Sequence, residues 1–275
     1  MTNLMPNHPG FYNPPLTRNE VCPVHGNFES RCFLEGDWTS CPVCHAGEIQ
    51  VREQEEESGR HAADRLARFH RRVAESGIPD RFRDRRLSTY SANLPGQKRV
   101  LAFAQGYASE FDEVRKIGRS AIFVGSPGTG KTHLAVGIGL DVIEAGGAVF
   151  FTTVMRAMRR VKDTWSKFSA ESEGESIASL VAPDLLILDE VGTQFGSDTE
   201  RLILFDILNE RYERRRPTIL ISNLTLDDIE DGNRVVPGIK SYLGERVFDR
   251  LREDGGEFIA FDWTSFRREG CNNER

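Results

Sequence analysis

From about residue 120 to residue 261, short apolar runs alternate with longer stretches whose apolar residues recur at helical spacing. Each apolar run is four or five residues long, as expected of strands that are buried on both faces. Alternating strands and helices of this kind predict an α/β fold, a parallel sheet covered by helices on both sides. The five expected strands are 121–124, 148–152, 185–188, 218–222 and 258–261, and the helices between them include 199–215 and 240–251.

The first 90 residues have a different pattern. Residues 1–47 are rich in proline, glycine and cysteine and show little periodicity. Residues 48–75 are heavily charged, with a few apolar residues at helical spacing, which predicts a mostly solvated helix that ends at Gly77-Ile78-Pro79. We therefore expect a cysteine-rich module over 1–47, a charged helix and linker over 48–90, and an α/β core over 91–275.

Composition and charge set the broad class of protein. The chain has 275 residues, of which 28% are charged and 39% hydrophobic, enough for one sizeable core plus a smaller module. No apolar run approaches the roughly 18 residues of a membrane span, and the Asn- and Pro-rich start lacks a signal pattern, so we expect a cytoplasmic location. The net charge of −6 argues against a uniformly basic nucleic-acid binder but allows a local basic face.

A glycine-rich loop lies between the first expected strand and a helix-compatible run that begins at His133. Its glycines let backbone N–H groups surround phosphate oxygens, and the following helix directs its positive end at the same anion. Lys131 is expected to reach the terminal phosphates and the Thr132 hydroxyl to ligate Mg²⁺. We therefore expect the loop and His133 to bind ATP. The loop is Gly125-Ser126-Pro127-Gly128-Thr129-Gly130-Lys131-Thr132.

Polar side chains follow two further strands. Asp189 and Glu190 end the third apolar run, where Asp189 is placed to complete the Mg²⁺ shell and Glu190 to polarise an attacking water. A carboxylate that binds a metal is a poor base, so Asp189 would bind Mg²⁺ while Glu190, which does not, can act as the base. Asn223 follows the fourth strand, where its amide could hold the attacking water or sense the γ-phosphate. A turn asparagine is the alternative interpretation.

Two arginines lie four residues apart near the end of the chain. Arg246 and Arg250 would share one face of the expected helix 240–251. Arginine is the residue expected to stabilise charge on a transferring phosphoryl group, often from a neighbouring subunit. A surface helix held by salt bridges fits these residues equally well.

Together these motifs resemble the DnaC-like helicase loaders, AAA+ ATPases related to the IstB transposition ATPases. The similarity runs from about residue 77 to residue 268, and the order of the motifs is more specific than any single one. It implies a P-loop AAA+ core with a five-stranded parallel sheet. The motifs are the loop 125–132, Asp189-Glu190, Asn223, the Arg-x-x-x-Arg pair and the ending Phe261-Asp262-Trp263-Thr264-Ser265-Phe266-Arg267.

The resemblance implies a role for each residue of the nucleotide site. Lys131 and Thr132 would be the Walker A residues that hold phosphate and Mg²⁺. Asp189 and Glu190 would be Walker B, with Glu190 catalytic, and Asn223 resembles sensor 1.

The arginines also receive roles from the resemblance. Arg250 matches the arginine finger, with Arg246 as its nearest rival, which implies a homo-oligomer whose finger acts in trans. Arg267 matches the sensor 2 arginine. AAA+ proteins usually carry a helical lid after the core, and we expect no C-terminal lid here. The lid normally supports the sensor 2 arginine, so Arg267 would have to act without it.

Residues 155–167 occupy the place of the insertion that contacts single-stranded DNA in this group. The segment carries five basic residues and Trp165, which suit phosphate contact and base stacking. An amphipathic surface helix with Trp165 in the core is the alternative, and the sequence favours neither.

Two short pairs of metal-ligand residues lie in the first region. Cys22 and His25 form one pair, Cys41 and Cys44 the other, with fifteen residues between them. This spacing is typical of zinc sites, and the ligand set suits a closed structural Zn²⁺. Such a site would supply folding free energy to a segment too small for its own core. Reduced thiols in a tail are the alternative, and Cys32 and His45 are spare candidates.

These inferences favour an ATP-dependent loader that places a DnaB-type hexameric helicase on single-stranded DNA. In the loader group the N-terminal region contacts the helicase, so we expect the zinc module to dock there. DNA binding by the module is the rival, with Arg18 and Arg31 as its basic support. Two other functions stay open: an IstB-like ATPase that assists a transposase, and an adaptor that uses ATP as an assembly switch with little turnover.

Overall fold

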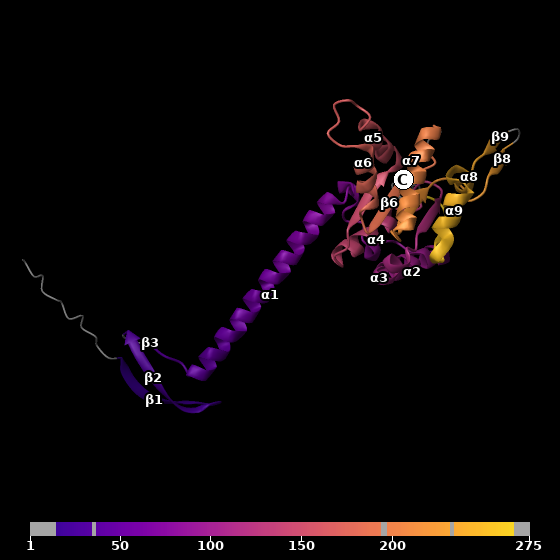
Figure 1. Ribbon diagram of the computed structural model, residues 1–275. Helices are drawn as coiled ribbons and strands as arrows, with labels where there is room; N and C mark the ends of the chain where they lie inside the picture. The colour runs from indigo at the N-terminus through magenta and orange to yellow at the C-terminus, as the bar shows by residue number, and fades with distance from the viewer. Residues whose placement is uncertain (1–14, 35–36, 194–196, 232–233, 267–275) are drawn as a thin grey trace, which may run out of the picture. The chain divides into compact units, whose positions relative to one another are not determined.

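The chain divides into two compact units, residues 1–67 and 68–275. The computed structural model describes residues 15–34, 37–193, 197–231 and 234–266 (Figure 1). Helix α1 (Pro42–Glu75) begins in the first unit, and its last residues belong to the second. Among the described residues, no helix combines the length and apolar character needed to cross a lipid bilayer.

The first unit is built on an antiparallel hairpin that the sequence pattern did not predict. β1 (Leu16–Cys22) pairs with β2 (Gly26–Leu34), and β3 (Asp37–Trp38) extends the sheet on the far side of β2. β1 is mostly exposed, and the inner face of β2 carries the polar Ser30 between Phe28 and Cys32, so neither strand shows a clear alternation of apolar residues. α1 begins at Pro42, earlier than expected, because proline is well tolerated in the first turn of a helix.

The second unit contains the expected five-stranded parallel sheet. Its strand order is β10-β4-β7-β6-β5, and all four strand pairs are parallel. The α/β prediction is therefore confirmed, with each expected strand present. The strands are β4 (Ala121–Gly125), β5 (Val149–Thr153), β6 (Leu185–Val191), β7 (Thr218–Ser222) and β10 (Glu257–Phe261).

Helices cover both faces of this sheet (Figure 1). Successive strand residues point to opposite faces, so Phe123 joins the core beneath α2 to α4, and Ile122 joins the core beneath α5 to α9. Both cores consist of buried apolar side chains. The helices are α2 (Pro95–Ser109), α3 (Phe111–Ile117), α4 (Lys131–Glu144), α5 (Val154–Asp163), α6 (Glu173–Val181), α7 (Asp198–Glu213), α8 (Ile239–Leu243) and α9 (Glu245–Arg252).

The single helix expected over 240–251 is two helices. Gly244 separates α8 from α9 with φ of 80° and ψ of 146°, a conformation that residues with a side chain rarely adopt. Before α8 lies a short hairpin, and three short 3-10 helices complete the described elements. They are β8 (Ile229–Asp231), β9 (Arg234–Val236), η1 (Asp80–Phe82), η2 (Leu87–Thr89) and η3 (Glu253–Gly255).

The second unit buries the charged side chain of Arg211 completely. The guanidinium of Arg211, on α7, donates to the Thr218 hydroxyl and to the carbonyl oxygens of Leu180, Val181, Pro183 and Pro217. Burial lowers the pKa of Arg211 to about 9. The side chain thereby ties α7 to the end of α6 and to the start of β7.

Candidate nucleotide site and cysteine cluster

A cavity of about 730 Å³ lies where the parallel strands end. In open α/β sheets this carboxyl edge is where ligands bind. The P-loop follows β4, Asp189 and Glu190 end β6, and Asn223 follows β7, so strand order brings these residues together. Of the predicted site residues, the cavity is lined by Pro127, Gly128, Gly130, Lys131, Thr132, His133, Asp189, Glu190 and Asn223.

The glycines of the loop are required by its close contacts. Gly125 has φ of 142°, and a Cβ atom there would lie 2.3 Å from the carbonyl oxygen of Phe261 on β10. Gly130 has φ of 95°, and its Cβ would lie 2.7 Å from the ring of Tyr90. The loop therefore folds tightly between β10 and the segment before α2, with its backbone facing the cavity.

Lys131 is buried at the start of α4. Its Nζ donates to the carbonyl oxygens of Gly125 (2.6 Å) and Ser126 (2.9 Å). Burial lowers the pKa of Lys131 from 10.5 to about 8, against the opposing attraction of Asp189. An ammonium group that is poorly solvated gains strongly from an anionic ligand.

Thr132 and Asp189 contact each other across the cavity. The Thr132 hydroxyl donates to Oδ2 of Asp189 at 2.9 Å, and the backbone N–H of Glu190 donates to Oδ1 at 2.7 Å. Burial raises the pKa of Asp189, while these hydrogen bonds oppose the shift. A hydroxyl and a buried carboxylate side by side are oxygen donors of the kind that Mg²⁺ prefers.

A bulge at the end of β6 sets the direction of the two carboxylates. Leu188 pairs with Leu220 and Val191 with Ser222, so β6 carries one residue more than β7 in this interval. Glu190 lies within the bulge with φ of 61°, a left-handed conformation that is strained for a residue with a side chain. Such bulges re-aim side chains beside active sites, and here Asp189 and Glu190 both line the cavity.

A second wall of the cavity was not predicted from the sequence. It comes from the segment between α1 and α2, with Phe266 and Arg156 completing it. His133 contacts this segment, since its Nε2 lies 2.9 Å from the carbonyl oxygen of Arg86 and its ring packs edge-on against Tyr90. The basic run that starts at Arg81 was the available signal, but no motif linked it to the loop. The segment's lining residues are Pro79, Arg81, Phe82, Arg85, Thr89 and Ser91.

The two candidate finger arginines do not line the cavity of their own chain. Both lie on α9, where Arg246 packs over the ring of Phe205 and Arg250 over the ring of Tyr212. The Nη1 atom of Arg250 is buried without a hydrogen-bond partner among the described residues. Arg267, the expected sensor 2 arginine, lies outside the described residues.

Residues 155–167 form most of α5 and the start of the loop that follows it. α5 buries one face, including Met158 and Val161, against the sheet. Trp165 lies outside this core with 51% of its surface exposed, and its Nε1 donates to Glu173. The segment is an amphipathic surface helix followed by an exposed tryptophan, so the placement of Trp165 in the core is wrong. Contact with single-stranded DNA stays a prediction.

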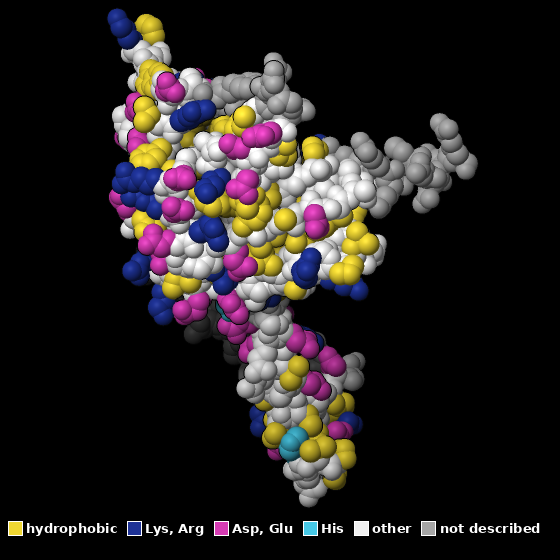
Figure 2. All heavy atoms as spheres, turned by 90° about the vertical axis from the view of Figure 1, so that its right-hand side faces the viewer, with side chains coloured by type: hydrophobic (Ala, Val, Ile, Leu, Met, Phe, Trp, Pro, Cys, Tyr) yellow, Lys and Arg dark blue, Asp and Glu magenta, His cyan; other side chains and the backbone are white. Residues whose placement is uncertain are grey.

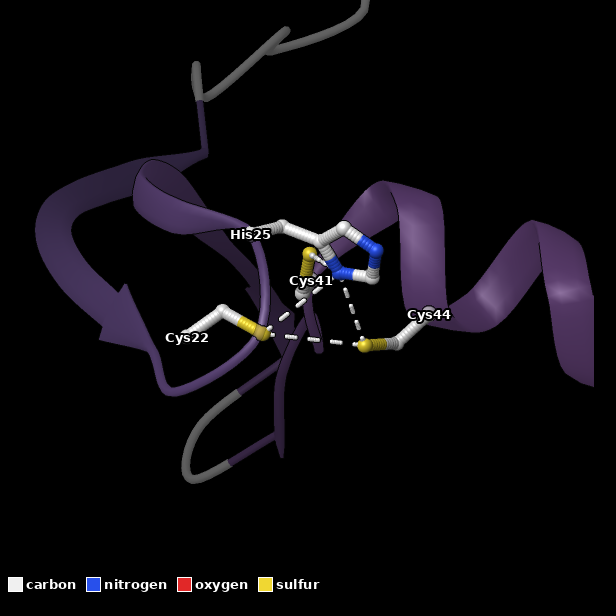
Figure 3. A group of neighbouring side chains, drawn as sticks. All are labelled: Cys22, His25, Cys41 and Cys44. Carbon is white, nitrogen blue, oxygen red and sulfur yellow. Dashed lines mark hydrogen bonds between the residues drawn. The ribbon is translucent and has the colours of Figure 1, made fainter.

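In the first unit, the two ligand pairs converge (Figure 3). The Nδ1 atom of His25 lies 3.7 Å from the sulfurs of Cys22 and Cys41 and 3.3 Å from that of Cys44. The sulfurs of Cys22 and Cys44 are 3.6 Å apart. Tetrahedral zinc with bonds of about 2.3 Å to sulfur and 2.0 Å to nitrogen separates its ligand atoms by about 3.5–3.8 Å. Four of the six pairs approximately match this spacing, and all four ligand atoms lie within 4.8 Å of one another, so the four side chains could hold one zinc ion.

The cysteines of this cluster differ in acidity. Hydrogen bonds from the backbone of Val24, and then of His25, lower the pKa of Cys22 to about 6. The hydrogen bond to Cys22 raises the pKa of Cys44 to about 11. Neighbouring thiolates repel one another, so full ionisation of the cluster requires a cation among them. The spare candidates Cys32 and His45 are not members of this cluster.

Known proteins share both the sequence and the fold. A family model described as IstB-like ATP binding protein matches residues 109–254. The replicative helicase loader DnaC of Buchnera aphidicola (subsp. Acyrthosiphon pisum) is 35% identical over 225 residues, which cover 80% of this chain and 86% of that protein. The DnaC of Escherichia coli K12 is 32% identical over 231 residues, which cover 82% of this chain and 89% of that protein.

A solved structure agrees with these relatives. The crystal structure of the DnaC helicase loader aligns with a TM-score of 0.55 and 24% identity, over 66% of this chain and 99% of that one. At this identity the match supports the fold, while the sequence relatives establish the family. With its P-loop, its paired carboxylates and its parallel five-stranded sheet, the chain belongs to the IstB/DnaC family of AAA+ P-loop ATPases.

Proposed function

We propose that this chain is an ATP-dependent loader that places a hexameric, DnaB-type replicative helicase onto single-stranded DNA. The observation that carries the proposal is the extent of the match to proteins named replicative helicase loader. It spans 225 residues and 86% of the Buchnera protein, well beyond the ATP-binding family region 109–254. The similarity therefore includes sequence outside the ATPase core.

In this proposal ATP lies in the cavity at the carboxyl edge of the sheet. The loop 125–132 surrounds the phosphates, with Lys131 and the start of α4 facing them. Thr132 and Asp189 would hold Mg²⁺, which neutralises phosphate charge. Glu190 polarises the attacking water, and Asn223 holds that water or senses the γ-phosphate. Support comes from the shared cavity and from the 2.9 Å contact between Thr132 and Asp189.

A neighbouring copy of the chain completes the site with an arginine. We favour Arg250 over Arg246, because Arg250 matches the arginine finger position of the family. Neither arginine lines the cavity of its own chain, as expected of a residue that acts on the site of a neighbour. The working form is then a homo-oligomer, on its partner or on DNA. Arg267 stays a proposal as sensor 2.

The cysteine cluster is proposed to hold structural Zn²⁺ through Cys22, His25, Cys41 and Cys44. The distances between these ligand atoms support this assignment. We propose that the module docks on the helicase. Binding of DNA by Arg18 and Arg31 is the rival, but Arg31 is paired with Glu29 and Arg18 with Glu20, which weakens it.

A reconstituted loading assay tests the function. The full chain is mixed with the purified replicative helicase of its host, ATP, Mg²⁺ and circular single-stranded DNA, and transfer of the helicase to the DNA is measured. We expect a stable complex with the helicase, and transfer that requires ATP. Lys131→Ala should abolish ATP-dependent transfer, whereas Lys116→Ala, an exposed control on α3, should not.

The other two functions predict different outcomes of the same assay. The family model is described as IstB-like, which favours a transposase as the second candidate partner. Binding to a transposase from the same genome, without binding to the helicase, would overturn the loader proposal. Helicase transfer that needs ATP binding but proceeds without hydrolysis would indicate the adaptor.

A further inference from the structure

We propose that Arg156 bridges the nucleotide cavity and a groove along α5, so that ATP and a single-stranded DNA phosphate each strengthen binding of the other. The inference rests on the proposed function, because it takes DNA as the second ligand. It assigns the coupling of the two ligands to one side chain.

The backbone fixes where Arg156 begins. Thr153 is the last residue of β5, and it pairs in register with Asp189 on the neighbouring strand β6. α5 starts directly after Thr153, whose hydroxyl caps it by accepting from the N–H of Arg156 at 3.3 Å. Arg156 therefore lies in the first turn of a helix that starts beside the carboxylates of the nucleotide site.

A groove of about 350 Å³ runs along the exposed side of α5. Arg156 lines both this groove and the nucleotide cavity, which also contains Lys131 and Glu190. The other groove residues come from α5 and from the loop after it, which projects beside α5 in Figure 1. They are Arg159, Arg160, Asp163, Thr164, Ser169 and Glu171.

The cations of α5 differ in whether they already have an acidic partner. Arg160 pairs with Glu171 at 3.1 Å, and Lys162 pairs with Glu200 at 2.6 Å. Arg156 and Arg159 are exposed, and neither forms an ion pair with any residue that the structure describes. They lie three residues apart and so share a face of the helix. These two arginines are thus available to an anionic ligand.

Single-stranded nucleic acid suits the groove better than a simple anion does. The loop after α5 carries Trp165, 51% exposed, and Phe168, 98% exposed. Exposed aromatic side chains beside basic ones provide base stacking together with phosphate contacts. A duplex or inorganic phosphate would use the arginines but leave both aromatic rings unused.

The bridge follows from the chemistry of the guanidinium group. Its five N–H donors form a planar fork, so one edge can contact a nucleotide phosphate while another contacts a DNA phosphate. The first anion orders a long, exposed side chain, so the second anion binds without that ordering cost. The shared cation also reduces repulsion between the two anions. Both effects make the coupling positive.

A binding cycle on the full chain tests the bridge. The Kd of a fluorescent oligothymidylate is measured with and without AMPPNP and Mg²⁺, and the Kd of AMPPNP with and without the oligonucleotide. In the wild type we expect each ligand to improve binding of the other by the same factor, about five-fold or more. In Arg156→Ala that factor should fall to about one, while both ligands still bind.

Two variants separate the bridge from a simple loss of charge. Arg159→Ala should weaken DNA binding but keep the wild-type coupling factor, because Arg159 does not line the nucleotide cavity. Arg156→Lys keeps the charge but loses the fork, and should retain only part of the coupling.

Two results would overturn the inference. One is an unchanged coupling factor in Arg156→Ala, and the other is a wild type that shows no coupling or does not bind the oligonucleotide. Helicase transfer is judged separately by the loading assay. If the wild type loads no helicase but Arg156→Ala loses the coupling, the loader function is refuted, whereas the role of Arg156 in coupling is supported.

Discussion

The two units of the chain are stabilised in different ways. In the described part of the first unit, the only buried apolar side chains are three cysteines, Cys22, Cys32 and Cys41. The second unit has two apolar cores, one on each face of its sheet (Figure 2 shows its surface). A segment without an apolar core needs another source of folding free energy. We therefore predict that the proposed zinc ion stabilises the first unit, as apolar packing stabilises the second.

The two sites are also assembled differently. The cysteine cluster joins two pairs, each closed within a few residues of chain by a tight turn or the first turn of α1. The nucleotide site joins residues 57 positions apart, Thr132 and Asp189, through the order of strands in the sheet. Damage to the first site should therefore unfold its own unit, and damage to the second should mainly change chemistry.

Removal of the proposed zinc ion should have the largest effect, and it tests whether the metal stabilises the first unit alone. Structural zinc supplies on the order of 10 kcal/mol of folding free energy to small domains. A chelator, or Cys41→Ser, should abolish protection from hydrogen exchange over 15–41 and leave the second unit protected. Hydrogen exchange followed by mass spectrometry, with metal content measured in parallel, gives both readouts. Cys32→Ser, outside the cluster, is the control that should retain one zinc ion per chain.

Unchanged protection over 15–41 in the metal-free protein would show that the metal does not stabilise the first unit. Loss of protection in both units would show that the second unit depends on the metal as well.

Substitution of the buried Arg211 should destabilise the second unit without affecting the first. Arg211→Ala removes the guanidinium donor from the carbonyl oxygens of Leu180, Val181 and Pro183 and creates a cavity. We expect the free energy of unfolding of this unit to fall by about 3–5 kcal/mol, with zinc content unchanged. Urea unfolding, monitored by hydrogen exchange in each unit, measures this. Arg214→Ala removes an exposed ion pair with Glu210 and should cost about 1 kcal/mol or less.

A loss of stability in Arg211→Ala no larger than that in Arg214→Ala would show that the guanidinium is not needed to hold α6, α7 and β7 together.

The smallest expected effect concerns the pH dependence of ATP binding. The pKa of Lys131 is about 8 in the folded chain, so the side chain loses its proton as pH rises through 8. A bound triphosphate favours the charged form, so above pH 8 ATP binding takes up a proton. The Kd for ATP should then rise by about tenfold per pH unit. Calorimetry at pH 8.5 in two buffers of different ionisation enthalpy measures the proton uptake.

In the protein without nucleotide, a rise in pH has the opposite effect on folding stability: it increases stability, whereas it weakens ATP binding. Between pH 8 and 10.5 the unfolded chain binds more protons at Lys131 than the folded one, so the contribution of Lys131 to stability rises with pH. Thr132→Ala leaves Lys131 in place and should keep the pH dependence of binding, although it binds ATP more weakly. A Kd that stays constant from pH 7 to pH 9.5 would contradict the assignment of Lys131 as the phosphate-binding cation.

Much of the second unit could be predicted, because the buried strands are continuous apolar runs that each end at a motif. The break at Gly244 was missed, since glycine ends some helices and is tolerated inside others. The strands β1 and β2 were missed because β1 is mostly polar and exposed, and the polar Ser30 interrupts the buried face of β2. The wall from 79–91 was missed because its contact with the loop depends on tertiary packing around Tyr90.

The strained conformation of Glu190 has no sequence signal at all. The bulge depends on how β6 pairs with β7, and pairing is a property of the folded sheet. The residue types at the site were therefore predictable, but their directions were not.

The catalytic role of Glu190 is tested most directly by ATP turnover in Glu190→Gln. We expect this variant to bind ATP as the wild type does, since glutamine has the same shape and Lys131, Thr132 and Asp189 stay in place. Hydrolysis should fall by about 10²–10⁴-fold, the usual contribution of a general base. Glu213→Gln, on α7 and outside the cavity lining, should hydrolyse ATP normally. Normal turnover in Glu190→Gln would show that Glu190 does not polarise the attacking water.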